Sequence, residues 1–552
     1  MKLKNILYSM MMGTAVLTGT TSCVSDLDQY PHTETTSKDV YTSLANYEAV
    51  LGKIYAAMVT SGQGKGGDNK DMESVLNNGS GFDYMRMFIN MQECGTDEFA
   101  STWLTGEQTT GLTYLSWDAN DAWVSDMYYR IYYNIALCNE FLRNANSASF
   151  SGADAEKMKE YKAEVRFMRA LFYYHALDFY RNIPMVTEND PVGSYIPPRY
   201  TPQQTFDYIE SELKDCVGDM LPASTCPYGQ ASQGAAYTLL AKLYLNSEVY
   251  TGVAKYAECK EACKKVMDMG YSLESDYSKL FNADNDKRTN EIIFALPVSA
   301  EHTVSWGSST YLVCGQVSMS NANQNVADYG VTAGWSEFRL RPEFVDKFTQ
   351  TDIDGGGDKR CKFFTNGQSK DVTSMTDETT GYLSEKWSNL KDDGTTASNT
   401  ADAGVETDYP LFRLADVYLM YVECVARLGE DWDNWDGGSD AEAATRKEGA
   451  IYYINKVRER AYGDAEHNVW KDNFASDADF LQFILDERAR ELYHEGYRRT
   501  DLIRFGEFTT NKYIWQWKGG THDGQAVDSK YNIYPIPNTE LTANPNLHND
   551  NY

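Results

Sequence analysis

One stretch near the C-terminus carries most of the information about the fold: residues 484–508 read ILDERARELYHEGYRRTDLIRFGEF. Glu487, Glu491 and Glu495 recur every four residues, so a helix through this stretch places the three carboxylates on one face. Arginines surround these carboxylates in the sequence, at positions Arg488, Arg490, Arg498, Arg499 and Arg504. Carboxylates with so many guanidinium neighbours stay ionised. We predict an ion-pair network that fastens a C-terminal helix to the rest of the protein.

The same carboxylates offer an enzymatic alternative. A retaining glycosidase uses two carboxyl groups about 5–5.5 Å apart, and residues four positions apart on a helix approach that spacing. However, such an enzyme also needs one carboxylic acid with a raised pKa, and neighbouring arginines lower the pKa of a carboxyl group. A glycoside hydrolase that uses Glu487 and Glu491 is therefore the least favoured function.

Helical patterns dominate the chain on both sides of a long loop-rich region. In residues 154–181, Val165, Met168, Phe172 and Phe179 recur on one face of a 3.6-residue period. Further helices are predicted over residues 41–58, 124–142, 235–250, 255–269, 412–428, 442–462 and 480–495.

Two local sequence patterns predict a helix start and a helical hairpin. Thr201 is a natural N-cap, Pro202 suits the first helical position and Gln204 can reach back to the cap. Residues 235–269 form an Ala-rich helical hairpin whose length and small residues (Ala241, Ala257 and Ala262) resemble a tetratricopeptide repeat. The fold class is therefore mainly α, with tetratricopeptide-like helix pairs.

The chain changes character over residues 275–410, where Gly, Ser, Asn, Asp and Thr dominate apart from a strand-like run at 292–298. A loop-rich region of this length is usually functional. We predict a helical region over 41–274, a variable ligand-binding region over 275–410, and C-terminal helices with a Pro/Asn-rich coil over 411–552. The first and last helical regions should pack together.

The N-terminus reads as an export signal. Residues 1–22 combine Lys2 and Lys4 with an apolar stretch and small residues, and Cys23 follows. We predict lipid attachment at Cys23 and an extended tether over 23–40; the alternative is ordinary signal cleavage with an incidental cysteine. No later stretch is long and apolar enough to span a bilayer.

Charge and composition restrict the ligand. The 552 residues carry a formal net charge of −30, which opposes a broad phosphate-binding surface, so we exclude nucleic acid. A neutral sugar is indifferent to this charge. The chain also has 40 Tyr and 11 Trp, residues that serve both cores and binding surfaces.

No motif calls for a metal or a cofactor, and none is predicted. The seven His are isolated. Asp352, Asp354 and Asp358 begin like a calcium loop, but Phe363 stands where the final glutamate belongs, which favours a solvated acidic turn. The nine cysteines after Cys23 are scattered and are interpreted as buried free thiols.

Three tryptophans lie in polar loops, where burial in the hydrophobic core is less expected than on a helix face: Trp103, Trp306 and Trp335. An indole stacks on the apolar C–H face of a sugar ring, and the polar neighbours can bind its hydroxyls. The alternative for each is that the tryptophan anchors its own loop. Other tryptophans are interpreted as packing residues: Trp387, Trp432, Trp435, Trp470, Trp515 and Trp517.

Several long motifs together resemble one family, the SusD/RagB-like nutrient-binding lipoproteins of the Bacteroidetes. LDQYP (27–31) follows the cysteine, and residues 163–186 read AEVRFMRALFYYHALDFYRNIPMV, with Arg181-Asn182 departing from the usual Tyr-Gly. DYPLFRLADVYLMYVECVARLG (408–429), the stretch 484–508, and YPIPNTELTANPNLHND (534–550) complete the set.

The resemblance implies a helical body with a loop-rich ligand-binding insertion. It implies a non-catalytic glycan-binding lipoprotein on the outer membrane, which delivers oligosaccharide to a SusC-like TonB-dependent transporter. Trp103 and Trp335 lie in segments that correspond to the aromatic platforms of relatives, and Trp306 and Tyr311 are further candidates. A surface binder of peptide or another nutrient is the alternative, since some relatives have that role.

Overall fold

The computed structural model describes residues 37–62, 64, 72, 75–76, 82–399, 404–433, 449–550 and 552. The described residues fall into two units, which divide between Tyr47 and Glu48. In the first unit, α2 (Ser37–Val40) precedes the start of α3 (Leu44–Ala56). The export signal, Cys23 and nearly all of the tether lie outside the described residues and stay predictions. Among the helices that are described, none is long and apolar enough to cross a membrane.

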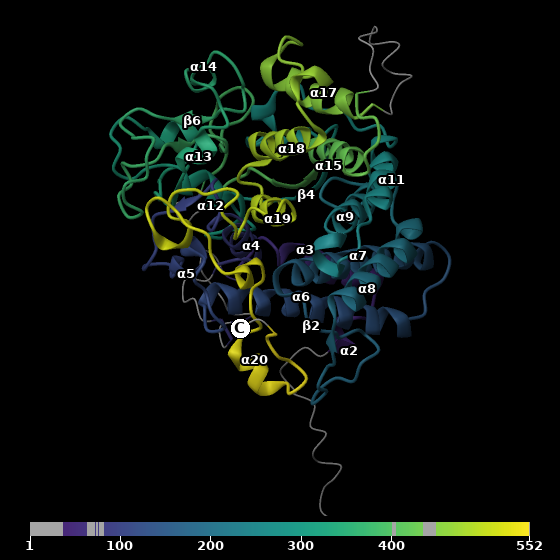
Figure 1. Ribbon diagram of the computed structural model, residues 1–552. Coiled ribbons are helices and arrows are strands. Elements are labelled where there is room, and N and C mark those ends of the chain that lie inside the picture. The colour runs from purple at the N-terminus through teal and green to yellow at the C-terminus, as the bar shows by residue number, and fades with distance from the viewer. Residues whose placement is uncertain are drawn as a thin grey trace, which may run out of the picture. The chain divides into compact units, whose positions relative to one another are not determined.

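The first half of the second unit is helical, as predicted (Figure 1). Successive helices pack as pairs, α6 with α7 and α9 with α11. The predicted helix over 235–250 is divided at Asn246 into α9 and α10. The helices after α3 are α4 (Tyr84–Glu93), α5 (Thr110–Tyr114), α6 (Ala122–Ser147), α7 (Ala153–Tyr180), α8 (Pro202–Cys216), α9 (Gln233–Leu245), α10 (Ser247–Thr251) and α11 (Tyr256–Met267).

The local signals around α7 and α8 are confirmed. The four apolar residues predicted on one face of α7 are buried, but so are nearly all residues from Ala163 to Tyr180, because α6, α8 and α9 pack around this helix. At the start of α8, the Thr201 hydroxyl accepts from the Gln204 N–H (3.2 Å) and the Gln204 side chain accepts from the Thr201 N–H (2.9 Å).

The small-residue pattern of the α9–α11 hairpin is only partly right. Ala241 and Ala262 are buried, whereas Ala257 is exposed. Cys259 fills that role instead, because its buried thiol donates to the Ala241 carbonyl at 3.2 Å. The cysteines in the described ranges are free thiols, as predicted, although Cys226 and Cys361 are half-buried.

The loop-rich region contains short elements that pair across long sequence distances. The predicted strand is β4, and it pairs antiparallel with β8, so Ile292 lies opposite Arg413 and both ends of the loop-rich region meet. The strands and helices of and around this region are β1 (Ala100–Ser101), β2 (Ile183–Pro184), β3 (Arg199–Tyr200), β4 (Ile292–Leu296), α12 (Ser308–Gly315), β5 (Phe338–Arg339), α13 (Pro342–Val345), α14 (Gln350–Ile353), β6 (Phe363–Phe364), β7 (Leu383–Ser384) and β8 (Tyr409–Arg413).

The C-terminal helices depart from the predicted bounds in three places. Residues 412–413 belong to β8, the helix that carries Glu487 ends before Glu495, and the tail includes a short helix. Residues 442–448 of one predicted helix lie outside the described ranges. The elements are α15 (Leu414–Arg427), α17 (Ala450–Tyr462), α18 (Asp477–Leu492), α19 (Arg498–Arg504) and α20 (Asn538–Ala543).

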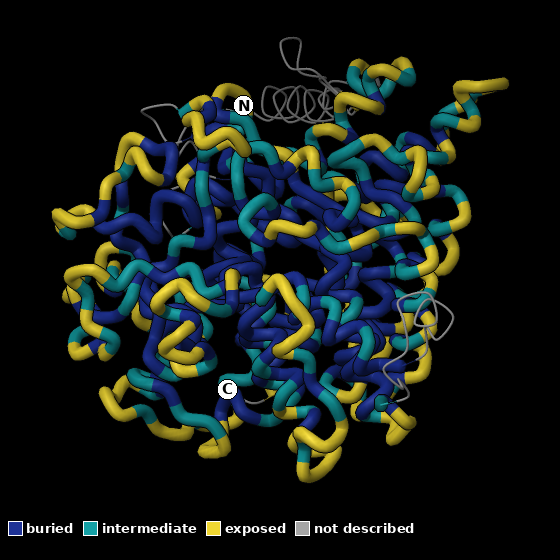
Figure 2. Tube along the Cα trace, turned by 90° about the horizontal axis from the view of Figure 1, so that it is seen from above, coloured by how far each residue is buried: buried dark blue, intermediate teal, exposed yellow. Residues whose placement is uncertain are grey.

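In the second unit, α15 contacts α11 on one side and α17 and α18 on the other. Figure 1 shows the loop-rich segments with α12, α13, α14 and β6 gathered beside α18 and α19, away from α9 and α11. Buried backbone fills the interior and exposed backbone is concentrated in outer turns (Figure 2). The expected packing of early and late segments is also found, since the Arg498 guanidinium binds Asp97 through two bonds of 2.7 and 2.8 Å.

An ion-pair network is present around the three glutamates, but its arginines come mostly from other elements than predicted, and we call it the core network. Of the five arginines predicted as partners, only Arg490 binds one of these glutamates, Glu487, whereas the others bind different acidic residues. The core network comprises Glu291, Glu487, Glu491, Glu495, Arg360, Arg413 and Arg460, all buried. Glu491 contacts Arg413 at 2.5 Å, Arg460 at 2.5 Å and Arg360 at 3.3 Å. Burial opposes ionisation of Glu487 and Glu491, but the guanidinium groups outweigh it and lower the pKa of both, to about 2 for Glu491.

Candidate functional site

Trp103 and Trp335 lie side by side, although 232 positions separate them in the sequence. The Trp103 indole N–H donates to the Trp335 carbonyl at 3.0 Å. Trp103 is 40% exposed and Trp335 is half-buried. This hydrogen bond brings together two residues predicted from separate polar loops, and we call these two tryptophans the indole platform.

Short backbone pairings hold the two loops of the indole platform together. Strand β1 pairs with β5, and the Thr102 N–H donates to the Glu337 carbonyl at 2.8 Å. On its other side the Trp335 N–H donates to the Cys314 carbonyl at 2.9 Å, at the end of α12. The indole of Trp335 is thus carried on backbone fixed from two directions.

The Trp103 ring packs directly against Gly106. A Cβ on Gly106 would lie only 3.2 Å from the ring, so the ring covers a residue that has no side chain. A substitution at Gly106 would push the indole outward or turn it.

Trp306 is also exposed, at 41%, and its loop is tied to the start of α4. Its carbonyl accepts from the Arg86 guanidinium at 2.7 Å. Asp83 caps α4 and also accepts from the Ser305 hydroxyl at 2.6 Å. A Cβ on Gly307 would lie within 2.4 Å of the Asp83 carboxylate, so only glycine fits there.

Arg86 connects all three tryptophan loops. Besides the Trp306 carbonyl, it binds Glu107 at 2.5 Å and Glu337 at 3.1 Å, both through Nη2. Glu107 follows Trp103 in its loop, where its N–H donates to the Trp103 carbonyl at 3.1 Å, and Glu337 lies two residues after Trp335. We call this group of three charged residues the Arg86 node. Its role had no signal in the sequence.

Tyr311 does not belong to the binding surface, which corrects the prediction. It is 2% exposed, because its ring is covered by the Arg86 guanidinium 4.1 Å from the ring centre. Its hydroxyl donates to the buried Asn90 side chain at 2.7 Å. Tyr311 therefore packs beneath the tryptophan loops and supports Arg86.

Polar groups missed by sequence reasoning lie next to the indole platform. The half-buried Glu378 carboxylate accepts from the hydroxyls of Ser336 and Ser318, the latter at 3.0 Å. Burial opposes its ionisation, but these hydroxyls lower its pKa. Met319, bonded through its N–H to the Ser336 hydroxyl, is 56% exposed and extends the apolar surface. Glu378 occurs in an ordinary Thr-rich turn, so no pattern marked it.

Comparison with known proteins identifies the family. The chain is 32% identical to the starch-binding protein SusD of Bacteroides thetaiotaomicron, over 99% of both chains. The SusD family profile matches residues 358–552, and a profile described as "Starch-binding associating with outer membrane" matches residues 27–245. This chain belongs to the SusD family. A SusD-like protein of Bacteroides ovatus is 23% identical over 82% of this chain and 79% of its own length.

Solved structures share the SusD-family fold. A SusD-like protein of Bacteroides fragilis matches with a TM-score of 0.70 at 18% identity, over 95% of this chain and all of its own. Surface glycan-binding protein A of Bacteroides thetaiotaomicron, solved in complex with laminarihexaose, matches with a TM-score of 0.65 at 16% identity. It covers 92% of this chain and 99% of its own. At these identities the likeness establishes the fold, mainly helical with a loop-rich part.

Five of the six tryptophans predicted as packing residues of this SusD-family chain lie in the described ranges. Trp387, Trp432 and Trp515 are buried, as predicted for packing residues. Trp470 and Trp517 are only half-buried, although the Trp517 indole N–H donates to the Val372 carbonyl at 2.7 Å. Trp435 lies outside the described residues.

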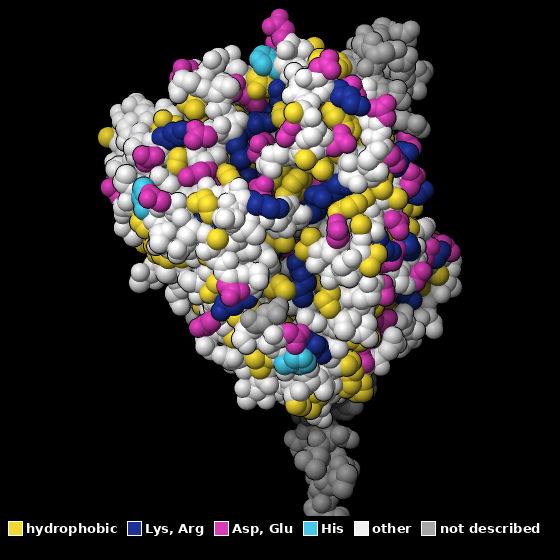
Figure 3. Space-filling view, viewed as in Figure 1, with side chains coloured by type: hydrophobic (Ala, Val, Ile, Leu, Met, Phe, Trp, Pro, Cys, Tyr) yellow, Lys and Arg dark blue, Asp and Glu magenta, His cyan; other side chains and the backbone are white. Residues whose placement is uncertain are grey.

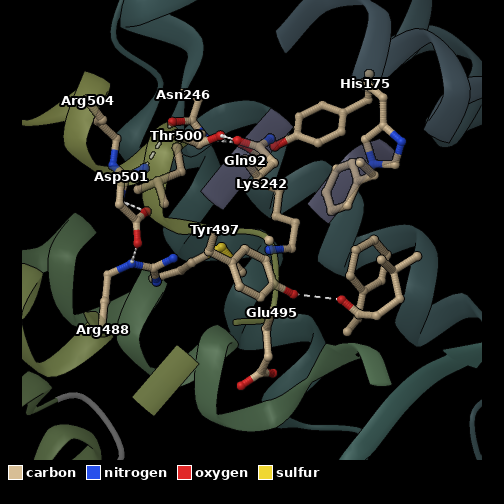
Figure 4. Close-up of a pocket in the computed structure, with 17 residues that line it drawn as sticks. Gln92, His175, Lys242, Asn246, Arg488, Glu495, Tyr497, Thr500, Asp501 and Arg504 are labelled. Atoms are coloured by element: carbon tan, nitrogen blue, oxygen red, sulfur yellow. Dashed lines mark hydrogen bonds and ion pairs between the residues drawn. The ribbon is translucent and has the colours of Figure 1, made fainter. Parts of the chain in front are cut away.

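An interior cavity within the helical body is not suited to a sugar. It has a volume of about 30 Å³, enough for a water molecule or two. Figure 4 shows that charged side chains point into it, including Lys242, Arg488 and Asp501. Burial lowers the pKa of His175 at its edge to about 3, so this imidazole is neutral. The cavity is a small pocket of the core, lined by both charged and apolar side chains.

Asp352, in the sequence that begins like a calcium loop, has a structural role. Asp352 accepts from the backbone N–H groups of Thr349 and Asp358, both at 2.7 Å, so it organises its own turn. Over the ranges the structure describes, no group of His, Cys, Asp or Glu side chains is arranged to hold a metal ion. On the face drawn in Figure 3, acidic and basic side chains are interspersed.

Proposed function

We propose that this SusD-family chain captures glycan at the cell surface and that the indole platform is its binding surface. The observation that carries the proposal is the exposed Trp103 ring bonded to the backbone of Trp335. Loops held on a rigid scaffold carry a large share of binding residues, and an exposed indole offers a flat apolar face to a ligand.

The chemistry of the indole platform suits a neutral oligosaccharide. The indoles and Met319 offer apolar area to the C–H faces of sugar rings. The Glu378 carboxylate and the amide-rich loop over residues 321–325 offer hydrogen-bonding groups to the hydroxyls. Because the full-length relative in Bacteroides thetaiotaomicron is a starch-binding protein, an α-glucan is the first ligand to test.

A binding role without catalysis is further supported by the core network. Glu487 and Glu491, the two carboxylates considered for hydrolysis, are fully buried and held ionised by arginines. A buried carboxylate with a lowered pKa can neither reach a glycosidic bond nor donate a proton to it.

We further propose attachment to the outer membrane through Cys23 and delivery of the glycan to a SusC-like TonB-dependent transporter. The family resemblance and the profile described as associating with the outer membrane support this role. Palmitate labelling of the full chain should detect the lipid and lose it in Cys23→Ala. Co-purification of a transporter with the tagged chain would support delivery.

The experiment that tests the proposed function is a binding screen of the mature chain. Native affinity gels containing starch, laminarin or other polysaccharides should retard the protein in at least one case. Calorimetry with maltoheptaose, laminarihexaose and a mixed peptide pool should give heat only with an oligosaccharide. Binding of peptide with no binding of any glycan would overturn the proposal in favour of a peptide-binding role.

A further inference from the structure

A surface cavity between helices α6 and α7 lies outside the tryptophan loops. It has a volume of about 460 Å³, which is in the range of pockets that hold a small ligand. Its wall comes from the C-terminal end of α6, the first half of α7, the end of α8 and the 3-10 turn Val217–Asp219. None of the described residues that line it belongs to the three tryptophan loops, so it is separate from the indole platform, and we call it the α7 cavity.

Three basic side chains of helix α7 line the α7 cavity: Lys159, Lys162 and Arg166. Their spacing of three and four residues places them on one face of the helix. Asp219 is the one acidic residue among the described residues that line the cavity. This excess of basic side chains is local, because the whole chain has 80 Asp and Glu against 50 Lys and Arg. The α7 cavity is therefore a positively charged recess in an acidic protein.

Like charges at this helical spacing repel one another, and acidic neighbours offset them only in part. Lys159 binds Asp219 at 2.7 Å, and Arg166 binds Glu212 at 2.8 Å. Lys162, which is half-buried, has no ion-pair or hydrogen-bond partner among the described residues. The Lys162 ammonium therefore keeps all of its N–H donors available.

Arg166 also keeps donors available. Its Nε and Nη2 atoms both bind Glu212, and Nη2 lies 3.6 Å from Asp215. Its Nη1 atom has no hydrogen-bond partner in the part of the chain that the structure describes. An ammonium and one edge of a guanidinium thus lie four positions apart on α7, and both groups bind carboxylates and phosphates well.

The rest of the α7 cavity suits a compact organic ring. Ala148, Phe150 and Met158 give it apolar area, and the exposed Asn146 side chain is an amide. A sugar ring has an apolar C–H face that can lie on the apolar residues, and it has hydroxyls that can bond to the amide. A bare inorganic ion would use the two cations but leave most of the 460 Å³ unused.

We propose that the α7 cavity is a second ligand site that binds an acidic sugar, a ring with one carboxylate or phosphate group whose charge is bound by Lys162 and Arg166. This site goes beyond the proposed function, because it lies apart from the indole platform and takes a charged ligand rather than a neutral one.

Calorimetric titration of the mature chain at pH 7, in a buffer free of phosphate, tests the proposal. The probes are glucuronate and glucose 6-phosphate, and glucose is their neutral counterpart. At least one of the two acids should bind, and glucose should bind about 10-fold more weakly, because it offers the cations no charge. The acid that binds more tightly identifies the charged group, a carboxylate or a phosphate. Added salt should weaken this binding, since both cations are only partly buried.

Lys162→Met is the matched variant, because it keeps an apolar stem and removes the charge. It should weaken binding of the acidic sugar by about 10-fold, whereas Lys162→Arg should keep most of the affinity. Lys265→Met, at an exposed position on α11 outside the cavity, should bind as the natural chain does. Maltoheptaose should bind equally to Lys162→Met and to the natural chain.

Three results would overturn the proposal. The first is that neither acid binds, and the second is that Lys162→Met binds the acids as tightly as the natural chain does. The third is that acetate and inorganic phosphate bind as tightly as the matching sugar acids, since charge alone would then account for the binding. If an acidic sugar binds through Lys162 but every neutral glycan fails to bind, the proposed function is wrong and the second site stands.

Discussion

The core network and the Arg86 node use the same two residue types with opposite electrostatic results. In the core network, Glu491 has three guanidinium neighbours and its pKa is lowered to about 2. In the Arg86 node, two carboxylates share one guanidinium and the pKa of Glu337 is raised to about 8. Both sites are buried, and the balance between burial and neighbouring charges sets the direction at each carboxyl group. Glu291 in the core network shows this balance, because its pKa is raised by burial although Arg413 and Arg460 both contact it.

This difference separates the part of the molecule that holds the fold from the part that presents the ligand surface. The core network joins α18 to β8 and α17 through buried ion pairs between glutamates and arginines. The Arg86 node joins three surface loops, each with an exposed or half-exposed tryptophan. Mutations in the two regions should therefore affect different measurements.

The largest effect is expected from Glu491→Gln in the core network. The change removes the carboxylate charge that Arg413 and Arg460 share with Glu491, although both arginines keep Glu291. Breaking a buried pair costs about 3–5 kcal/mol. Urea unfolding should show this loss, whereas Glu261→Gln, an exposed control on α11, should change stability by less than about 0.5 kcal/mol. A loss below about 1 kcal/mol for Glu491→Gln would mean that the network does not hold the fold.

Substitutions in the indole platform should weaken glycan binding and leave the stability of the fold unchanged. Trp335→Ala and Trp103→Ala should each weaken glycan binding by about 1–3 kcal/mol, a magnitude taken by analogy from stacking of bases on aromatic side chains. Their urea unfolding curves should stay close to that of the natural chain, because both side chains retain solvent exposure. Unchanged affinity in both variants would remove these residues from the site.

Tyr311→Phe tests whether Tyr311 stabilises the fold beneath Arg86 or contacts the glycan. The change removes the donor to the buried Asn90 oxygen and should lower stability by about 1–2 kcal/mol. Glycan affinity should be unchanged, since Tyr311 is buried under Arg86. A variant of natural stability with weaker binding would restore Tyr311 to the binding surface.

The smallest effect is expected from Trp103→Phe. Phenylalanine keeps an aromatic face but cannot donate to the Trp335 carbonyl, and one hydrogen bond contributes about 0.5–1.5 kcal/mol. Calorimetry should find a loss of affinity smaller than that of Trp103→Ala. If the two variants bind equally weakly, the hydrogen bond between the loops matters more than the ring.

The sequence predicted the helices because their signals are local. The cap at Thr201 and the apolar periodicity in α7 each depend on residues within a few turns. The pairing of β4 with β8 was not predicted, because its partners are more than a hundred positions apart and both strands are short. Glu495 was placed on α18 because spacing alone does not show that the helix ends at Leu492.

Of the candidate site, only the residues with a local sequence signal were predicted. Trp103 and Trp335 stood out because large aromatic residues are unusual in polar loops, and the family resemblance placed them in corresponding segments. Tyr311 looked equivalent, but it lies on α12, whose described residues are all buried. Arg86 and Glu378 carried no signal, since their roles depend on contacts between loops.

The central claim is that Trp103 and Trp335 form one glycan-binding surface. The most direct test is calorimetric titration of maltoheptaose into the Trp103→Ala/Trp335→Ala double variant at pH 7, with urea unfolding of the same sample. We predict that binding becomes undetectable while the unfolding curve stays close to that of the natural chain. Binding of natural affinity by a double variant of natural stability would contradict the claim.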